Sequence, residues 1–170
     1  ARATITAKNI AHLSGTNTGM MSPLVRGIFV SGDSATVANN SISTLSSMAS
    51  GSSTATYGIH CENGVLTANG NIIADLNEVR LAAGIQTDDA ELVAENNTIS
   101  HIAARFSYGI RTLHSTALLT GNDIRFLSTN ATSGSPAVCG ISATDGLLTT
   151  HGNVIAHLSN AVSTNTAITN

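Results

Sequence analysis

The sequence predicts an all-β fold, a right-handed parallel β-helix solenoid with about five to six coils and three short strands per coil. Three observations predict it: a repeat of 25 to 31 residues, period-two alternation of apolar residues within each repeat, and turn residues between the alternating segments. Each full repeat begins with a Gly-Ile pair, and the five pairs are Gly27-Ile28, Gly58-Ile59, Gly84-Ile85, Gly109-Ile110 and Gly140-Ile141.

An asparagine stands thirteen residues after each of these glycines, at Asn40, Asn71, Asn97, Asn122 and Asn153. Isoleucine follows two positions later in every copy, and leucine or isoleucine three positions after that. Residues 7–13 look like the end of a sixth copy. Because stacked coils are about 4.8 Å apart, each asparagine amide can bond the next, so we expect a structural asparagine ladder.

A second apolar pair stands eight and ten residues after each glycine, as in Leu92 and Ala94. Each repeat therefore contains three candidate strands, at Gly-Ile, at this pair and at Asn-x-Ile. A leucine-rich repeat would also match Leu92 to Ile102, but it needs a further leucine three residues before that segment. Those positions hold Gly32, Asn63, Asp89, His114 and Asp145. The β-helix is therefore favoured over the leucine-rich repeat.

The Gly-Ile…Asn-x-Ile pattern resembles the right-handed β-helix repeats of the pectin-lyase-like superfamily, and the resemblance covers nearly the whole chain. It implies the fold and says little about function. In polysaccharide-acting relatives, clefts floored by the coils and walled by loops bind sugar. Relatives with lyase activity use clustered acids and a basic residue, and the resemblance implies Arg111 for the latter.

The composition limits the function classes. The chain has 170 residues, of which 10% are charged and 3% aromatic, and its net charge is −3. It lacks the basic stripe of a nucleic-acid-binding protein and any apolar run of about 20 residues that would span a membrane. We predict a single β-helix domain over residues 1–170. The repeat is already running at both ends, which favours a segment of a longer solenoid or fibre, or self-association end to end.

Coil length varies only between the last Leu or Ile of one repeat and the next glycine. The two middle coils have short connections there, whereas longer ones occur around residues 14–26, 46–57 and 128–139. We expect the long loops to flank a shallow saddle over residues 58–108, where the acidic residues are concentrated. The candidate ligand-binding residues in this saddle are Asp75, Glu78, Arg80, His101 and Arg105.

A second group of acids follows the Gly-Ile strands. Glu62, Asp88 and Asp89 fall in the same or neighbouring columns of successive coils and offer hard oxygen ligands for calcium. No other cofactor is predicted. The sequence shows no Ser-His-Asp spacing and no phosphate-binding loop, so no catalytic residue is assigned and the question of enzymatic activity stays open.

Two functional hypotheses follow. The first is an extracellular or cell-surface structural or adhesive β-helix, such as a spike, stalk or filament segment, which pairs with flanking coils or with itself. The alternative is a carbohydrate-binding or polysaccharide-degrading β-helix that uses the saddle. The two hypotheses differ in whether the saddle side chains converge and face solvent together.

Overall fold

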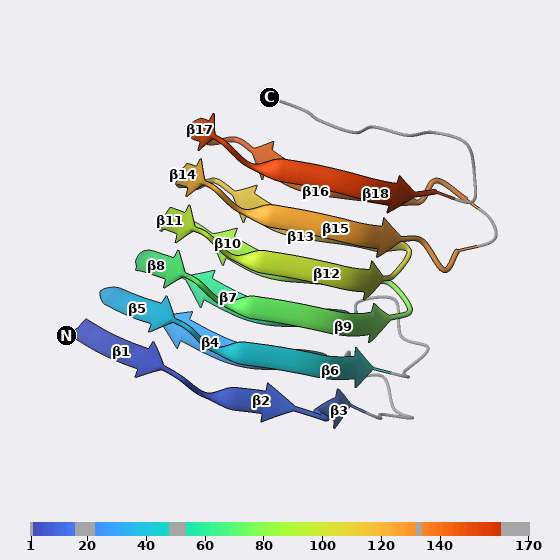
Figure 1. The fold of residues 1–170 in the computed structure, drawn as a ribbon, viewed down its shortest axis with the longest axis horizontal. Helices are drawn as coiled ribbons and strands as arrows, with labels where there is room; N and C mark the ends of the chain where they lie inside the picture. Colours follow the sequence, from blue (N-terminus) through green and yellow to red (C-terminus); the bar gives the residue numbers. More distant parts are fainter. Residues whose placement is uncertain (1, 16–22, 48–53, 132–133, 161–170) are drawn as a thin grey trace.

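In the computed structural model, residues 2–15, 23–47, 54–131 and 134–160 are described, and they form eighteen β-strands in three parallel sheets (Figure 1). Sheet A contains β1 (Arg2–Thr6), β5 (Ser34–Ala38), β8 (Val65–Asn69), β11 (Glu91–Glu95), β14 (Thr116–Thr120) and β17 (Leu148–His151). Sheet B contains β2 (Asn9–Ala11), β6 (Ser41–Ser47), β9 (Ile72–Glu78), β12 (Thr98–Ala103), β15 (Asp123–Ser128) and β18 (Val154–Ser159), with the short β3 (Ser14–Gly15) beside β6. Sheet C contains β4 (Leu24–Ser31), β7 (Ala55–Glu62), β10 (Leu81–Asp88), β13 (Phe106–Leu113) and β16 (Ala137–Thr144).

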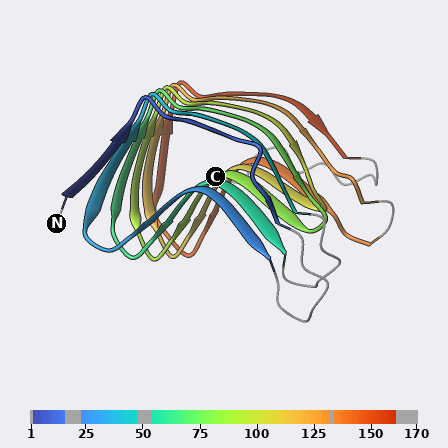
Figure 2. The same cartoon turned by 90° about the horizontal axis from the view of Figure 1, so that it is seen from below.

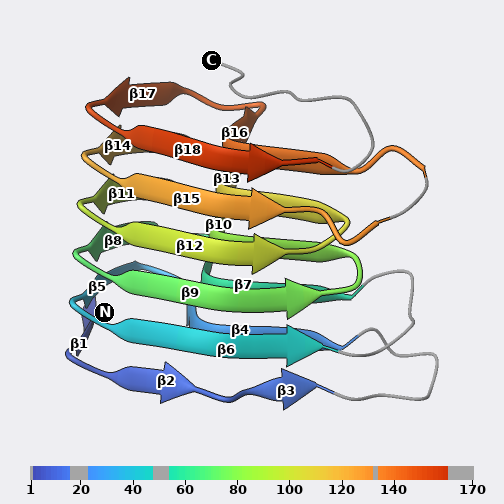
Figure 3. The same ribbon diagram turned by 45° about the vertical axis from the view of Figure 1, so that its right-hand side comes forward.

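The predicted solenoid is confirmed. Each coil runs through sheets C, A and B in that order, and every strand pairs in parallel with its equivalent one coil away (Figure 3). Seen from the N-terminal end, the chain turns clockwise as it recedes, so the solenoid is right-handed (Figure 2). The described residues contain no helix long and apolar enough to cross a membrane.

The repeated apolar columns form one continuous core along the solenoid axis. Isoleucine after glycine pairs with isoleucine in the next coil of sheet C, and the Asn-x-Ile isoleucines do the same in sheet B. Most of the inward-facing residues in the central coils, such as Ile85, Leu92 and Ile99, are fully buried. Because each coil rests on a copy of itself, small aliphatic side chains fill the core without large aromatic residues.

The five asparagines lie at the turn from sheet A to sheet B and are joined by hydrogen bonds. The Nδ2 of Asn71 donates to Oδ1 of Asn97, and the Nδ2 of Asn97 donates to Oδ1 of Asn122, both at 2.9 Å. In four of the five, Oδ1 also accepts the backbone N–H of the preceding asparagine, as Asn97 Oδ1 does from Asn71 at 3.0 Å, while Asn40 Oδ1 accepts that of Lys8. The ladder therefore satisfies buried backbone groups as well as the amides themselves.

The glycine column has a steric cause. A Cβ on Gly84 would lie 2.5 Å from Cγ2 of Ile99 and 2.7 Å from the carbonyl oxygen of Gly109, and the other four glycines of the column meet the equivalent Ile Cγ2 at 2.4 to 2.6 Å. Sheet C therefore approaches the isoleucines of sheet B too closely for any side chain. In Figure 2 its strands arch toward the interior of the coil, which makes the outer face of sheet C concave.

The long connections predicted to wall a saddle lie between sheets B and C. Residues 16–22, 48–53 and 132–133 within them fall outside the described residues. The saddle walls are thus described only in part, and the placement of the predicted binding residues is given with the site below.

Candidate functional site

The concave outer face of sheet C brings together polar and aromatic side chains that are far apart in the sequence. Parallel pairing places Arg26 beside Tyr57, Phe29 beside His60, and Glu62 beside Asp88. We call this group the concave-face cluster, and its members are Arg26, Phe29, Tyr57, His60, Glu62, Gln86, Asp88, Tyr108 and Arg111.

The curvature of the sheet buries the centre of this cluster although its side chains point away from the core. His60 is 3% exposed, Gln86 is 1% exposed and Tyr57 is 9% exposed. Ala83, on the neighbouring strand, provides the small residue against which Tyr57 packs, in an apolar group separate from the main core. The arch required by the glycines thus produces a sheltered polar site.

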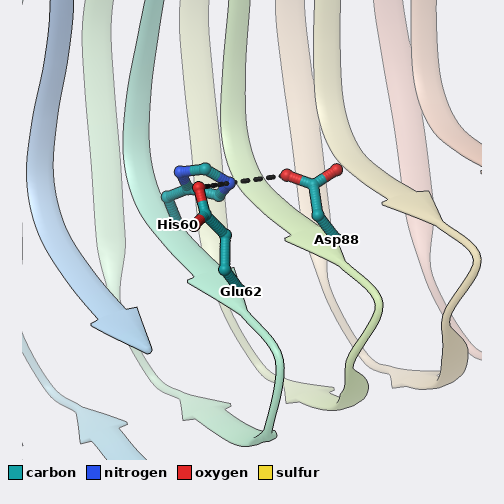
Figure 4. Close-up of side chains that lie close together, drawn as sticks. All are labelled: His60, Glu62 and Asp88. Atoms are coloured by element: carbon teal, nitrogen blue, oxygen red, sulfur yellow. Dashed lines mark hydrogen bonds and ion pairs between the residues drawn. The ribbon is translucent and has the colours of Figure 1, made fainter. Parts of the chain in front are cut away.

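Hydrogen bonds and ion pairs cross the centre of the cluster (Figure 4). The Nε2 of His60 lies 2.6 Å from Oδ2 of Asp88 and 3.6 Å from Oε1 of Glu62. Because an ionised carboxylate only accepts hydrogen bonds, Nε2 donates to Asp88. Both carboxylates are thus held next to one imidazole, with Glu62 on the same strand as His60 and Asp88 on the next.

Two arginines extend this network across four strands. The Nη2 of Arg26 donates to Oε1 of Glu62 at 2.9 Å. On the other side, Gln86 Nε2 donates to Oδ1 of Asp88 at 2.8 Å, and Arg111 Nη1 donates to Oε1 of Gln86 at 3.5 Å. The carboxylates of Glu62 and Asp88 thus both accept hydrogen bonds from N–H groups of neighbouring side chains.

Two buried nitrogens of the cluster have no hydrogen-bond partner, namely Nε of Arg26 and Nδ1 of His60. Buried polar atoms are rarely left in this state, since each one costs free energy until water or a ligand satisfies it. The guanidinium of Arg26 also lies 3.9 Å from the centre of the Phe29 ring. This end of the cluster therefore has unused hydrogen-bonding capacity beside an aromatic ring.

Burial and hydrogen bonding shift two pKa values within the cluster. Burial raises the pKa of Asp88, but hydrogen bonds from His60 and Gln86, together with nearby positive charge, outweigh it, so that the pKa lies below its usual value. Burial, with a smaller contribution from Asp88, raises the pKa of Tyr57. At neutral pH the site therefore presents an ionised Asp88 and a protonated phenol.

His60, Glu62 and Asp88 each offer a ligand atom within 4.8 Å of the others. This set fits a divalent ion that accepts nitrogen as well as oxygen, rather than calcium with oxygen ligands alone. An ion would have to displace the Nε2 proton of His60 and would lie beside the guanidinium of Arg26. Asp89, the third residue of the predicted calcium set, is 67% exposed and faces His114 at 3.9 Å.

The five predicted saddle residues lie in three different places. Asp75 and His101 face solvent from β9 and β12 of sheet B and line one groove. The carboxylate of Glu78 is buried, where Oε2 accepts from Thr56 Oγ1 at 3.0 Å and Oε1 accepts the N–H of Val79 at 2.7 Å.

Arg80 and Arg105 are exposed in the turns that lead from sheet B to sheet C. The guanidinium of Arg105 lies 5.2 Å from the centre of the Phe106 ring. Arg105 is therefore at the rim of sheet C, and the saddle residues form no single group.

Sequence reasoning missed the centre of the concave-face cluster. It assigned no role to His60, Arg26, Tyr57 or Tyr108. A usable signal was present, because the residues one and three positions after each Gly-Ile isoleucine must point outward when the isoleucine points inward. Stacking these positions from successive coils places His60 and Glu62 beside Gln86 and Asp88.

In comparisons with known proteins, no protein-family model, no curated protein and no solved structure matched this chain.

Proposed function

We propose that this chain is a carbohydrate-binding β-helix whose ligand lies on the concave outer face of sheet C. One observation carries the proposal: four of the five Phe and Tyr residues of the chain belong to sheet C strands, and three of them have an arginine stacked over the ring. These four residues are Phe29, Tyr57, Phe106 and Tyr108.

A chain with so few aromatic residues would not gather four of its five Phe and Tyr residues on one sheet for folding alone. Exposed aromatic faces pack against the apolar C–H faces of sugar rings, while carboxylates, amides and guanidinium groups bond the hydroxyls. Tyr108, Asp88 and Arg111 supply an aromatic ring, a carboxylate and a guanidinium group within one surface. The repeat pattern, which resembles that of the pectin-lyase-like superfamily, further supports a glycan as the ligand.

The arrangement favours binding over bond cleavage. Asp88 has a lowered pKa and is suited to accept hydrogen bonds rather than to donate a proton. His60 is directed at Asp88 through Nε2, and its other ring nitrogen is buried. We infer a protein that recognises glycans outside the cell or at a cell surface.

A glycan array followed by titration calorimetry tests this proposal. Tyr108→Ala removes a half-buried ring with Arg111 5.0 Å from its centre, and should weaken binding of the best array ligand at least about tenfold. Leu118→Ala, on the outer face of sheet A and 40% exposed, is the matched control and should bind as the parent does. Equal affinity for both variants would contradict the proposal.

A second candidate, a structural β-helix that stacks on further coils, is favoured by the end surfaces. Among the described residues, the outermost strands of each sheet pair on one edge only. Ile10 at one end, and Ile155 and Leu158 at the other, are only partly buried, whereas the equivalent residues of the central coils are fully buried. Unpaired edges with exposed apolar residues promote association.

We propose that this association is with another copy of the chain. Light scattering across a concentration series tests it. A mass that rises with concentration, and that returns to one chain in Val154→Lys, is the expected result. A constant monomer mass for the parent would contradict the structural candidate and leave the carbohydrate proposal unaffected.

A further inference from the structure

A column of outward-facing residues on sheet B has an unusual backbone conformation. In every coil one residue of the strand has φ between 54° and 59°, and the six residues are His12, Thr44, Asp75, His101, Phe126 and His157. This residue interrupts the pairing of its strand with the strands of the neighbouring coils. Two successive side chains therefore point outward, as Arg125 and Phe126 do.

Left-handed backbone is costly for bulky side chains and cheap for glycine or asparagine. The turn before the asparagine ladder follows that rule, with Asn39, Gly70, Asn96, Gly121 and Gly152. The sheet B column departs from it at Thr44 and Phe126, since histidine and aspartate also tolerate this conformation. The bulky ring of Phe126 occupies a position that its backbone conformation disfavours, which points to a role for the side chain itself.

Three of the rings form a stack along the solenoid. The centroids of His101 and Phe126 are 5.0 Å apart at an interplanar angle of 15°, and those of Phe126 and His157 are 4.6 Å apart at 5°. Phe126 is 46% exposed in this stack. Consecutive coils thus present a flat aromatic wall whose ring edges face solvent.

The wall borders a groove that runs parallel to the solenoid axis, across the strands that face the viewer in Figure 3. One part, of about 520 Å³, extends from His101 to His157, and a second part, of about 410 Å³, extends from Thr44 to His101. Both parts are lined by His101 and Ala103, so they are continuous. Serine, asparagine and alanine side chains form the opposite wall, at Ser46, Asn77, Ala103, Ser128 and Ser159.

We propose that this groove binds an uncharged linear oligosaccharide that lies along the solenoid axis. Among the residues that the structure describes, Asp75 is the one Asp, Glu, Lys or Arg that lines either part, so these residues offer no fixed cation for an acidic glycan. Serine and asparagine side chains can bond hydroxyl groups along one wall, and the aromatic wall offers apolar contact along the other.

An extended peptide is a poorer fit. It gains most of its affinity by adding to the free edge of a sheet, and the backbone of β9, β12 and β15 is already paired on both sides. A saccharide needs no such edge, since side chains alone recognise its hydroxyls. The groove is also on a different sheet from the concave-face cluster, so the two sites can be tested separately.

Titrations with neutral cello-, xylo- and malto-oligosaccharides of increasing length, and with oligogalacturonate as the acidic probe, test the inference. We expect at least one neutral series to bind with an affinity that increases with length, as more coils are covered. Phe126→Ala removes the middle ring of the stack and should weaken that binding roughly tenfold. Leu118→Ala, on the outer face of sheet A, is the control and should leave it unchanged.

Three results would overturn the inference: no binding of any neutral series, binding of oligogalacturonate alone, or equal affinity of Phe126→Ala and the parent. Loss of neutral binding in Tyr108→Ala but not in Phe126→Ala would place the glycan on sheet C. That result would reject the groove and support the proposed function. The reverse pattern would support the groove and count against sheet C as the site for that glycan.

Discussion

Replacement of Asn97 by alanine removes the central member of the asparagine ladder. Four hydrogen bonds are lost: Nδ2 donates to Oδ1 of Asn122 and to the carbonyl oxygen of Ala68, and Oδ1 accepts from N and Nδ2 of Asn71, all at 2.9 to 3.0 Å. The four residues that contribute these groups are fully buried. At about 1 kcal/mol of net stability for each bond, the free energy of unfolding should fall by about 4 kcal/mol.

Equilibrium denaturation in guanidinium chloride, followed by far-UV circular dichroism, measures this loss. Asn77→Ala is the matched control, because it deletes the same side chain from an exposed position of β9 and should change stability by less than about 0.5 kcal/mol. Asn153→Ala, at the end of the ladder, loses three bonds at a partly buried site and should fall between the two. Equal midpoints for Asn97→Ala and Asn77→Ala would refute the role of the ladder in stability.

Three further predictions concern packing and titration. Gly84→Ala places a Cβ 2.5 Å from Ile99 Cγ2 and against a backbone oxygen, so the free energy of unfolding should fall by about 1–3 kcal/mol in the same denaturation assay. Ser100→Ala, on the outer face of sheet B, is the control and should be nearly neutral. Because folding lowers the pKa of Asp88, this carboxylate contributes stability above about pH 4, and the contribution is lost as pH falls below that value. The melting temperature should therefore decrease less on acidification in Asp88→Asn than in the parent. Burial raises the pKa of Cys61 and of Tyr57, so stability should fall as pH rises past about 8.5 for the thiol and about 10 for the phenol. Because burial also raises the pKa of Cys139, Cys61→Ala should reduce the first of these losses and Cys61→Ala with Cys139→Ala should remove it, whereas a parent melting temperature that stays constant to about pH 11 would contradict both.

The solenoid could be predicted because its determinants repeat. Each coil offers the same glycine, isoleucine and asparagine to an identical neighbour, so the register follows from aligning the copies. Gly84 and Ile99 show the physical reason, since the close approach of sheet C to sheet B needs both residues in every coil.

The candidate site could be predicted only in part because its residues do not repeat. His60, Gln86 and Arg111 occupy one column with a different side chain in each coil, so alignment of the copies gives no consensus there. The shelter that buries them comes from the arch of the sheet, which a linear pattern does not show. Glu62 and Asp88 could be paired from their columns, whereas their partner His60 could not.

The saddle prediction inferred side-chain direction from loop length, and the strand decides that direction instead. Leu76 points into the core, so Glu78, two positions later, also points inward and its carboxylate is buried. At Asp75 and His101 the left-handed backbone shifts the alternation by one residue, which places both side chains outside. If the inward–outward alternation is restarted at each of these positions, it predicts Asp75 on the outside and Glu78 on the inside.

A crystal structure of the protein with the tightest-binding glycan from the array tests the central claim most directly. The account predicts the glycan on the concave face of sheet C, with a sugar ring against Tyr108 and a hydroxyl group within hydrogen-bonding distance of Arg111 or Glu62. A glycan bound on sheet A, or one bound without contact to any residue of the concave-face cluster, would contradict it.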